Sequence, residues 1–293
     1  MIGSMEVVGQ KSNNTTLLIR RIVAYVVLIL LVFISLFPFY LLLINATRER
    51  KQTGIQYYPG PELINNIKKL FSPATAVAYG SVFRALINSL IISAASSLLS
   101  VYFSAITAYA THVYHFKLRK FADTFILLIM MVPTQASAIG FYRIMKNWGL
   151  TNSYIPLIIP AIAAPATYYF MKQYMASSLP IEIVEAARID GCGEFRTFNS
   201  IVTPILKPAF AVQIIFTFVS NWNNFFMPRL IIDTKDKFTI PLVLSQMRAA
   251  GPQEQDLGVF YLYMVVAILP VVVVYLFLSK FIIRGVALGS VKG

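Results

Sequence analysis

Six long apolar runs leave this chain few ways to fold. Each is about as long as the roughly 20 residues that an α-helix needs to cross a hydrocarbon core of about 30 Å. Only 13% of the 293 residues are charged, against roughly a quarter in soluble domains. Lipid offers no partner to an open backbone group, so the pattern predicts an all-α membrane protein. The runs are Ile22–Ile44, Leu86–Ala110, Phe121–Ile144, Ser153–Tyr174, Ala209–Met227 and Val259–Phe281.

Prolines inside these runs refine the prediction. Proline removes a backbone N–H and bends a helix, so the spans that contain it are expected to bend. The carbonyls freed by each bend are expected to find partners inside the bundle. These prolines are Pro133, Pro156, Pro160, Pro165 and Pro270.

The net charge of +13 indicates contact with anionic lipid headgroups, because the basic residues lie in the loops between apolar runs. No nucleic acid is needed to explain them. Charge does not orient the chain, however. With the amino terminus inside, 13 of the 25 Lys and Arg residues fall on the inner side and 12 on the outer side.

A charged segment, EAARIDGCGEF at 185–195, interrupts the apolar pattern between the fourth and fifth runs. Pro180 lies at a first helical position, and Gly191 lies where that helix would end by taking a positive φ. The residues that follow predict a second short helix, ended by Pro204. Helical spacing on the first helix predicts one smooth face that another protein can hold, with Glu185 at its edge; that face comprises Ile183, Ala186, Ala187 and Asp190.

This segment resembles the EAA signature of the permeases of bacterial ABC importers. Glu-Ala-Ala at 185–187 is followed after three residues by Gly191, and after nine more by IVTP at 201–204. Thr203 departs from the leucine usual there. The stretch NWNNFF at 221–226 and the tail RGVALGSVKG are similar to the MalG-type, carbohydrate branch of that family.

The resemblance implies a type I ABC importer permease fold with six transmembrane helices in the bacterial inner membrane and both termini in the cytoplasm. Residues 1–82 would form a cytoplasmic tail, the first transmembrane helix and an extracytoplasmic loop. Residues 83–280 would form the permease core, with the EAA loop at 177–205, and residues 281–293 a cytoplasmic tail. The coupling helix of that loop would contact the ATPase through Glu185, Ala186, Ala187, Asp190 and Gly191.

The implied partners supply what this chain lacks. It has no GxxxxGK[ST] phosphate loop, so ATP and Mg are expected in a separate, homodimeric ATPase, and this chain is expected to be neither an enzyme nor the holder of a cofactor. A second, MalF-like permease and an extracytoplasmic sugar-binding protein complete the implied transporter. One cysteine, Cys192, excludes an internal disulfide and a multi-cysteine metal site.

Four polar or aromatic side chains in the spans are candidates for a cargo pathway. The amides of Asn221, Asn223 and Asn224 can bind sugar hydroxyls, and the ring of Tyr168 can stack on a sugar. Hydrogen bonding between helices and aromatic anchoring at the membrane interface explain the same residues at least as well. His112 and His115 are three residues apart, but no further metal ligand stands nearby in the sequence.

The identity of the cargo stays open at this stage. An outer side with 12 basic residues against six acidic ones would suit an anionic sugar such as alginate or another uronate. Contacts with the binding protein or lipid explain that charge too. A non-sugar ABC importer is one alternative. An ion-coupled secondary transporter is disfavoured, because no span centre carries Asp, Glu, Lys or Arg.

Overall fold

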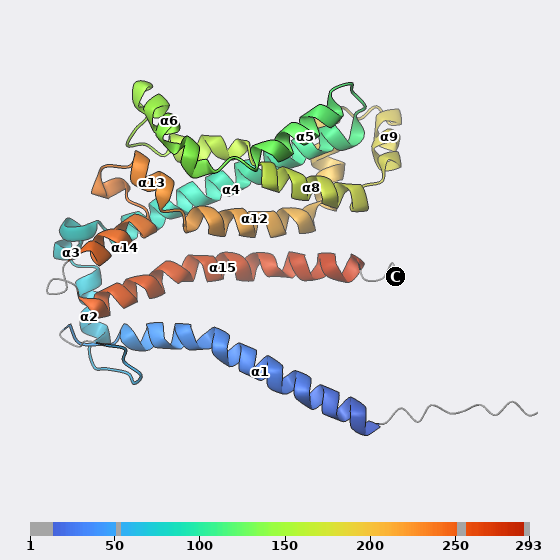
Figure 1. Cartoon of the computed structure of the whole chain (residues 1–293). Coiled ribbons are helices and arrows are strands. Elements are labelled where there is room, and N and C mark those ends of the chain that lie inside the picture. Colours follow the sequence, from blue (N-terminus) through green and yellow to red (C-terminus); the bar gives the residue numbers. More distant parts are fainter. Residues whose placement is uncertain (1–13, 51–53, 251–255, 290–293) are drawn as a thin grey trace, which may run out of the picture.

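The long helices run between two ends of the molecule (Figure 1). The computed structural model describes residues 14–50, 54–250 and 256–289, and within them all regular structure is helical. We call one end the α9 end, because it holds α9, the start of α1 and the end of α15; the other is the α2 end, with α2, α3, α13 and α14 (Figure 1). The helices and helical turns are α1 Asn14–Asn45, α2 Leu63–Leu70, α3 Pro73–Tyr79, α4 Val82–Val113, α5 Arg119–Ile129, α6 Thr134–Asn147, α7 Ile155–Ile158, η1 Ile159–Ile162, α8 Pro165–Ser178, α9 Ile181–Ile189, α10 Glu194–Arg196, the π-turn η2 Thr197–Val202, α11 Thr203–Ile205, α12 Lys207–Trp222, α13 Phe226–Ile231, η3 Lys235–Lys237, α14 Ile240–Ala249 and α15 Leu257–Gly289.

Four of the six predicted spans form helices that are long and apolar enough to cross a membrane. In the described residues these are Leu17–Asn45, Val82–Val113, Ile155–Ser178 and Leu257–Phe281, and the total reaches six if each of two bent helix pairs counts as one span. The second expectation, that prolines bend the spans, holds most clearly in the third. There α5 and α6 meet at 94° across a break that contains Pro133. The predicted third span, Phe121–Ile144, is thus present as two helices with the bend at the predicted proline.

The second bent pair lies at the start of the fifth span, where the helical stretch Glu194–Ile205 meets α12 at 82°. The sequence predicts that the first of these stretches ends at Pro204, but the helical stretch continues to Ile205. Pro204 is tolerated because it follows a π-turn and occupies the first turn of α11, where its missing N–H costs little. The fifth span also stops at Trp222, five residues before its predicted end.

Helix α4 lies at the centre, packed against both α8 and α12. Its buried face carries a row of serines at three- and four-residue spacing, which lets neighbouring backbones approach closely. Two of them satisfy carbonyls of the broken fourth span: Ser96 Oγ donates to the Leu157 carbonyl at 3.1 Å and Ser104 Oγ to the Ala164 carbonyl at 3.3 Å. The Leu157 carbonyl, three residues before Pro160, thus finds a partner in the bundle as predicted, whereas the Ala164 carbonyl also accepts the Tyr168 N–H of α8 at 2.9 Å. The row comprises Ser89, Ser93, Ser96, Ser97, Ser100 and Ser104.

Two separate apolar cores divide the molecule along its length. The α2-end core joins α4, α12, α14 and α15 through residues such as Trp222 and Tyr263, and Met145 of α6 belongs to it. The α9-end core joins α4, α8 and the α9–α12 segment through residues such as Met171, Val184 and Phe198. Helix α1 is exposed over almost all of its apolar length, as expected of a helix that faces lipid, and packs on α15.

The α2 end is closed by a hydrogen-bonded cap. The buried Asn66 amide donates to the carbonyls of Ala46 at 3.0 Å and Arg48 at 2.9 Å, which ties α2 to the end of α1. Asn88 Nδ2 donates to the carbonyls of Asp236 and Phe238, both at 2.9 Å, and so ties α4 to the segment before α14. These side-chain amides donate to loop carbonyls that no helical N–H reaches, and so they hold the irregular loops of the cap in place.

Gly258, at the start of α15, tests this cap. A Cβ atom there would lie 2.6 Å from the Arg48 carbonyl oxygen and closer still to Asn66 Nδ2. Gly258→Ala is therefore expected to destabilise the protein by about 1–3 kcal/mol through overpacking. Thermal unfolding of the purified protein in detergent measures this loss of stability. Gly140→Ala, in α6 with open space around its Cβ, is the control and should be neutral or slightly stabilising. Equal melting temperatures for the two variants would contradict the close fit at Gly258.

Candidate functional site

The EAA segment folds into two helices joined by a tight turn. Helix α9 begins at Ile181, so Pro180, whose backbone is extended, precedes the first helical position rather than occupying it as predicted. The helix ends at Ile189, and the chain turns at Gly191 with a φ of +76°. The Gly191 N–H donates to the Arg188 carbonyl at 3.0 Å and the Cys192 N–H to the Ala187 carbonyl at 2.9 Å. This pair of bonds is the Schellman motif, which satisfies the last carbonyls of a helix and favours glycine at the left-handed position. The predicted positive φ at Gly191 is confirmed.

The exposed face of α9 differs from the predicted one. Val184 is buried in the α9-end core and Ala187 is buried as well, so Ala187 does not face outward. The prediction placed it there because i, i+3 and i+4 spacing alone does not say which side of a helix the rest of the chain covers. The outward stripe comprises Glu182, Glu185, Ala186, Ile189 and Asp190, spaced over two turns.

Two large apolar side chains at the tip were missed from the sequence. Ile189 is 86% exposed and Phe195 is 75% exposed, although both are hydrophobic and lie in the most charged part of the chain. The sequence does contain a signal for them, because apolar residues flank Gly191 and Gly193. Exposed apolar side chains grouped in this way typically mark a contact surface. The tip therefore combines apolar side chains with the carboxylates of the stripe.

An ion pair clamps α9 to the helix that follows it. Arg188 Nε lies 2.8 Å from Glu194 Oε1, and the guanidinium also lies 5.2 Å from the ring centre of Tyr114. Tyr109 Oη of α4 donates to Glu194 Oε2 at 2.9 Å. Burial by itself raises the pKa of the Glu194 carboxyl, but hydrogen bonds from Arg188, Tyr114 and Tyr109 outweigh it and hold that pKa below its usual value. The carboxylate form thus persists at neutral pH and is lost only as pH falls through the lowered pKa.

Further contacts fix the segment to α4. The Phe198 ring packs between those of Tyr102 and Tyr109, with centroid distances of 5.9 and 5.4 Å. His112 Nε2 lies 3.1 Å from the carbonyl oxygen of Leu179, directly before α9. His115 instead lies near Arg119, so the two histidines engage different partners. The segment is held as part of the α9-end core rather than hanging from it.

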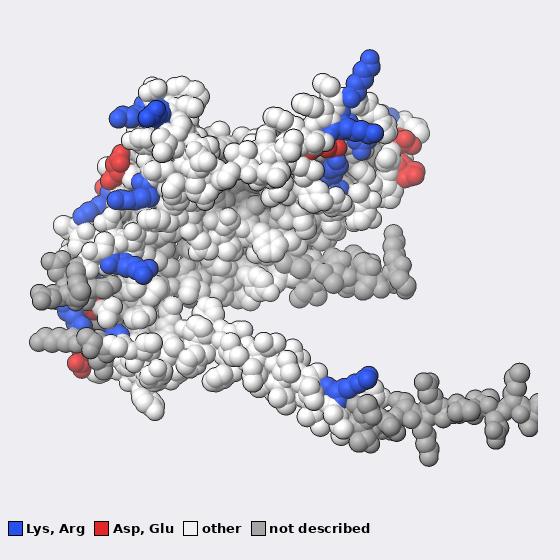
Figure 2. All heavy atoms as spheres, viewed as in Figure 1, with Lys and Arg blue, Asp and Glu red and all other residues white. Residues whose placement is uncertain are grey.

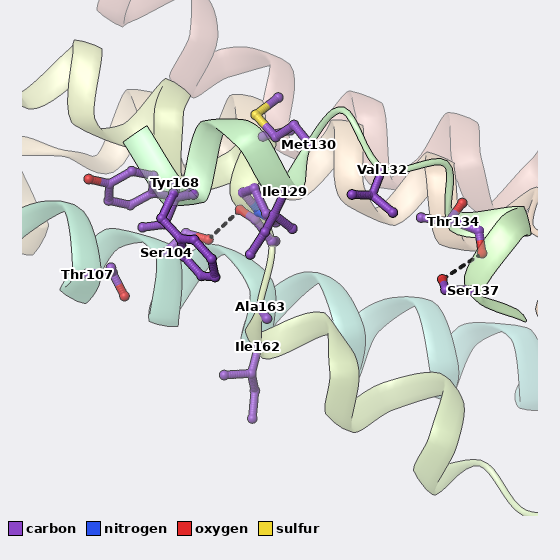
Figure 3. Close-up of a pocket in the computed structure, with 15 residues that line it drawn as sticks. Ser104, Thr107, Ile129, Met130, Val132, Thr134, Ser137, Ile162, Ala163 and Tyr168 are labelled. Atoms are coloured by element: carbon purple, nitrogen blue, oxygen red, sulfur yellow. Dashed lines mark hydrogen bonds between the residues drawn. The ribbon is translucent and has the colours of Figure 1, made fainter. Parts of the chain in front are cut away.

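A cavity of about 690 Å³ opens where the third and fourth spans are broken. Ile129, Met130 and Val132 of the α5–α6 break lie on one side of it, and Ile162 and Ala163 of the break before α8 on the other (Figure 3). Hydroxyl groups of Ser104, Thr107, Thr134 and Ser137 add polar points to an otherwise apolar lining. Such a mixture of apolar walls and few polar groups is typical of ligand and pathway surfaces.

The structure separates the predicted pathway residues. Tyr168 lines the cavity, but its hydroxyl is engaged with Asp123 and lies 3.0 Å from Thr111 Oγ1. The three asparagines lie at the end of α12 and do not line this cavity. Asn221 and Asn223 donate to carbonyls one turn back in their own helix, at 2.8 and 3.0 Å, and Asn224 Oδ1 accepts the Met227 N–H at 3.3 Å. Their amides therefore shape the junction of α12 and α13.

The fold and the EAA segment define a multi-span transport subunit, and comparison with known proteins gives its family. Residues 100–288 match the family described as binding-protein-dependent transport system inner membrane component, to which the chain belongs. It is 32% identical to the arabinooligosaccharides transport system permease protein AraQ of Bacillus subtilis over 94% of this chain and 97% of that protein. It is 30% identical to the sn-glycerol-3-phosphate transport system permease protein UgpE of Salmonella typhi, over 90% and 95%.

The fold is also similar to a solved structure. A chain in the crystal structure of a bacterial ABC transporter involved in the import of the acidic polysaccharide alginate matches with a TM-score of 0.74 and 20% identity, over 92% of this chain and 98% of that one. At that identity the likeness concerns the fold. The chain is accordingly a permease with the all-α fold of ABC importers, as the resemblance predicted.

The Schellman turn gives a matched pair of variants. Gly191 and Gly193 both have open space where a methyl group would be added, but only Gly191 has a positive φ. Gly191→Ala is expected to cost about 1–2 kcal/mol in left-handed backbone strain. Amide hydrogen exchange over residues 185–195 should then accelerate by about 5–30-fold. Gly193→Ala should leave the exchange nearly unchanged, and equal acceleration in both variants would argue against the strain.

Proposed function

We propose that this permease forms half of the translocation pathway of an ATP-driven, binding-protein-dependent importer whose cargo is an oligosaccharide. The observation that carries the proposal is the α9 tip, a rigidly held helix that presents a carboxylate stripe beside exposed Ile189 and Phe195. A soluble helix tip with this composition fits a protein cleft better than water or lipid. The AraQ relative, at 32% identity over almost the whole chain, supports an oligosaccharide as cargo.

The α9 tip is the docking surface for a homodimeric ATPase in this proposal. Ile189 would enter an apolar part of the ATPase cleft, while Glu185 at the edge of the stripe would pair with a basic residue of the partner. Within the described part of the chain Glu185 forms no ion pair, so its charge is available. ATP and Mg would be bound by that ATPase, and this chain would contribute no catalytic group.

The orientation follows from that partner, since ATP is cytoplasmic. The α9 end would face the cytoplasm together with both chain termini, and the start of α1 and the end of α15 do lie at that end (Figure 1). The α2 end would then face outward, toward an extracytoplasmic sugar-binding protein. A second, MalF-like permease would complete the pathway. The two tails, 1–13 and 290–293, lie outside the described residues.

The α2 end carries the charge that bears on an acidic cargo. Lys and Arg side chains are spread over this end, above α6 and around α13 and α14 (Figure 2). Some are neutralised, as in the ion pairs Lys69–Asp256 at 3.1 Å and Arg84–Asp236 at 2.7 Å. Six others are exposed and form no ion pair within the described residues: Lys68, Arg143, Lys146, Arg229, Lys235 and Arg248. Such a surface would favour an anionic sugar such as a uronate oligomer.

Reversal of the Glu185 charge tests the docking surface. Glu185→Lys is expected to leave the permease folded in the membrane but to weaken ATPase binding by about tenfold or more, because like charges would meet in the cleft. Co-purification of the ATPase with tagged permease measures this. Asp233→Lys makes the same change at an exposed site on the α2 end and is the control. Normal recovery of the ATPase with Glu185→Lys would remove α9 from the interface.

The cargo is tested with the purified four-component transporter in lipid nanodiscs. ATPase activity is measured with the binding protein and a panel of neutral oligosaccharides, uronate oligosaccharides and sn-glycerol 3-phosphate. Stimulation by an oligosaccharide is expected, and stimulation by uronates alone would support the basic α2 end as a cargo surface. Stimulation only by the phosphate ester, the cargo named for the UgpE relative, would overturn the sugar assignment.

A further inference from the structure

Asp123 is a carboxylate within the third span, next to the cavity. Tyr168 of α8 donates a short hydrogen bond to its Oδ1, and Lys172 Nζ lies 2.5 Å from its Oδ2. The Asp123 and Lys172 side chains are only 20% and 25% exposed. Ionised groups in a membrane helix are costly unless they are paired. The presence of this ion pair within two spans therefore suggests a specific role.

The pair is the polar attachment of α5 to α8, beside an apolar contact of Ile126 with the α9-end core. No residue of α5 is buried, and α8 is the element against which it mainly packs. Tyr168 and Lys172 are four residues apart and so share one face of α8, where both reach Asp123. The Tyr168 hydroxyl also lies 3.0 Å from Thr111 Oγ1, which extends the link to α4. Apolar contacts of the exposed α5 surface can slide, whereas this pair fixes position and register.

Helix α8 in turn belongs to the same body as α9. Met171 and Met175 of α8 share a core with Val184 of α9, and all three are fully buried. Only Leu179 and Pro180 separate the two helices, and the Leu179 carbonyl is held by His112. A displacement of α9 would therefore carry α8 with it, and α5 through Asp123.

The other half of the third span belongs to a different body. Ala138 and Met145 of α6 are buried, and Met145 lies in the α2-end core. The break between Ile129 and Thr134 is thus the point at which the span passes from one core to the other, at an angle of 94°. Met130 and Val132 of this break line the cavity (Figure 3).

We propose that Asp123 is a positioning residue that makes α5 move as one body with α8 and α9. The break at 130–133 is then a hinge, and motion of the docked α9 during the ATP cycle changes the shape of the cavity. This inference rests on the proposed docking of α9 on an ATPase. It needs no titration of Asp123, since the carboxylate acts as an ionic anchor throughout.

Spin-label distances in the assembled transporter test the proposal directly. Cys192, the one native cysteine, is first replaced by serine, and labels are placed at exposed positions of α5 (Phe121), α8 (Ala176) and α6 (Asn147). Between the nucleotide-free and ATP-bound states, the α5–α8 distance is expected to stay constant while the α5–α6 distance shifts. A constant α5–α6 distance, or an α5–α8 distance that changes with nucleotide, would overturn it.

Substitution of the anchor gives the second arm. Asp123→Asn retains an acceptor for Tyr168 but removes the charge, and it is expected to broaden the α5–α8 distances and lower sugar transported per ATP hydrolysed by about tenfold. The charge swap Asp123→Lys with Lys172→Asp should restore much of the loss. Thr124→Ala, whose hydroxyl bonds only within α5, is the matched control.

The two proposals fail in different ways. If both proposals are right, the ATPase no longer co-purifies with the Glu185→Lys permease but still co-purifies with the Asp123→Asn permease. Unchanged transport per ATP in Asp123→Asn, with docking intact, would overturn the anchor alone. Normal recovery in Glu185→Lys would overturn the docking of α9 whatever the distances show.

Discussion

The structure depends on one requirement, that every backbone group inside the membrane has a hydrogen-bond partner. The spans that line the cavity violate regular helix geometry, and their prolines leave carbonyls without an intrahelical donor. At the broken fourth span helix α4 contributes to this, since Ser96 donates to the Leu157 carbonyl and Ser104 adds a second hydrogen bond to the Ala164 carbonyl, which also accepts the Tyr168 N–H. Small side chains on the same face also bring the backbones close enough for those bonds to form. These bonds stabilise the irregular backbone next to the break.

Because α4 passes through both cores, it is also the reference against which other elements can move. Its α2 end is tied to the cap by Asn88 and Ser89, and its α9 end to the EAA segment by Tyr102 and Tyr109. Packed cores have discrete arrangements rather than continuous ones. The central helix is continuous through both cores and resists bending. The molecule can therefore change shape mainly at a place where another span passes from one core to the other and its helix is interrupted. The break at 130–133 satisfies that condition.

Much of this architecture could be predicted from sequence, because it depends on local chemistry. Apolar run length marks the spans, Pro133 marks a bend, and Gly191 marks the end of α9 with its left-handed turn. The errors concern tertiary packing. Ala187 is buried because the rest of the chain covers its side of α9. The core around the neighbouring Val184 includes Phe198 and Val202, and these two residues follow a turn whose angle no local pattern specifies.

Pairs across long sequence separations are harder still. Asp123 and Lys172 lie near the ends of two predicted spans, where each alone is explained by the membrane interface, and only the fold shows that they meet. The amides of Asn221 and Asn223 illustrate the converse. Their polarity within an apolar run is the basis of the predicted cargo contact, and in the structure the side-chain N–H of each donates to a carbonyl one turn back.

Exposed polar groups finally distinguish the faces of a membrane protein better than exposed apolar ones do. The apolar surface of α1 needs no partner, since lipid covers it. Next to the bend, however, Thr134, Gln135 and Ser137 at the start of α6 are exposed. Thr134 and Ser137 find acceptors in their own turn, but within the described residues the Gln135 side-chain amide donates to none. Hydrocarbon would leave that amide unsatisfied at a cost of several kcal/mol, on the order given for unpaired groups in apolar media. The face at the bend therefore belongs against water or another chain, which is what half of a translocation pathway requires.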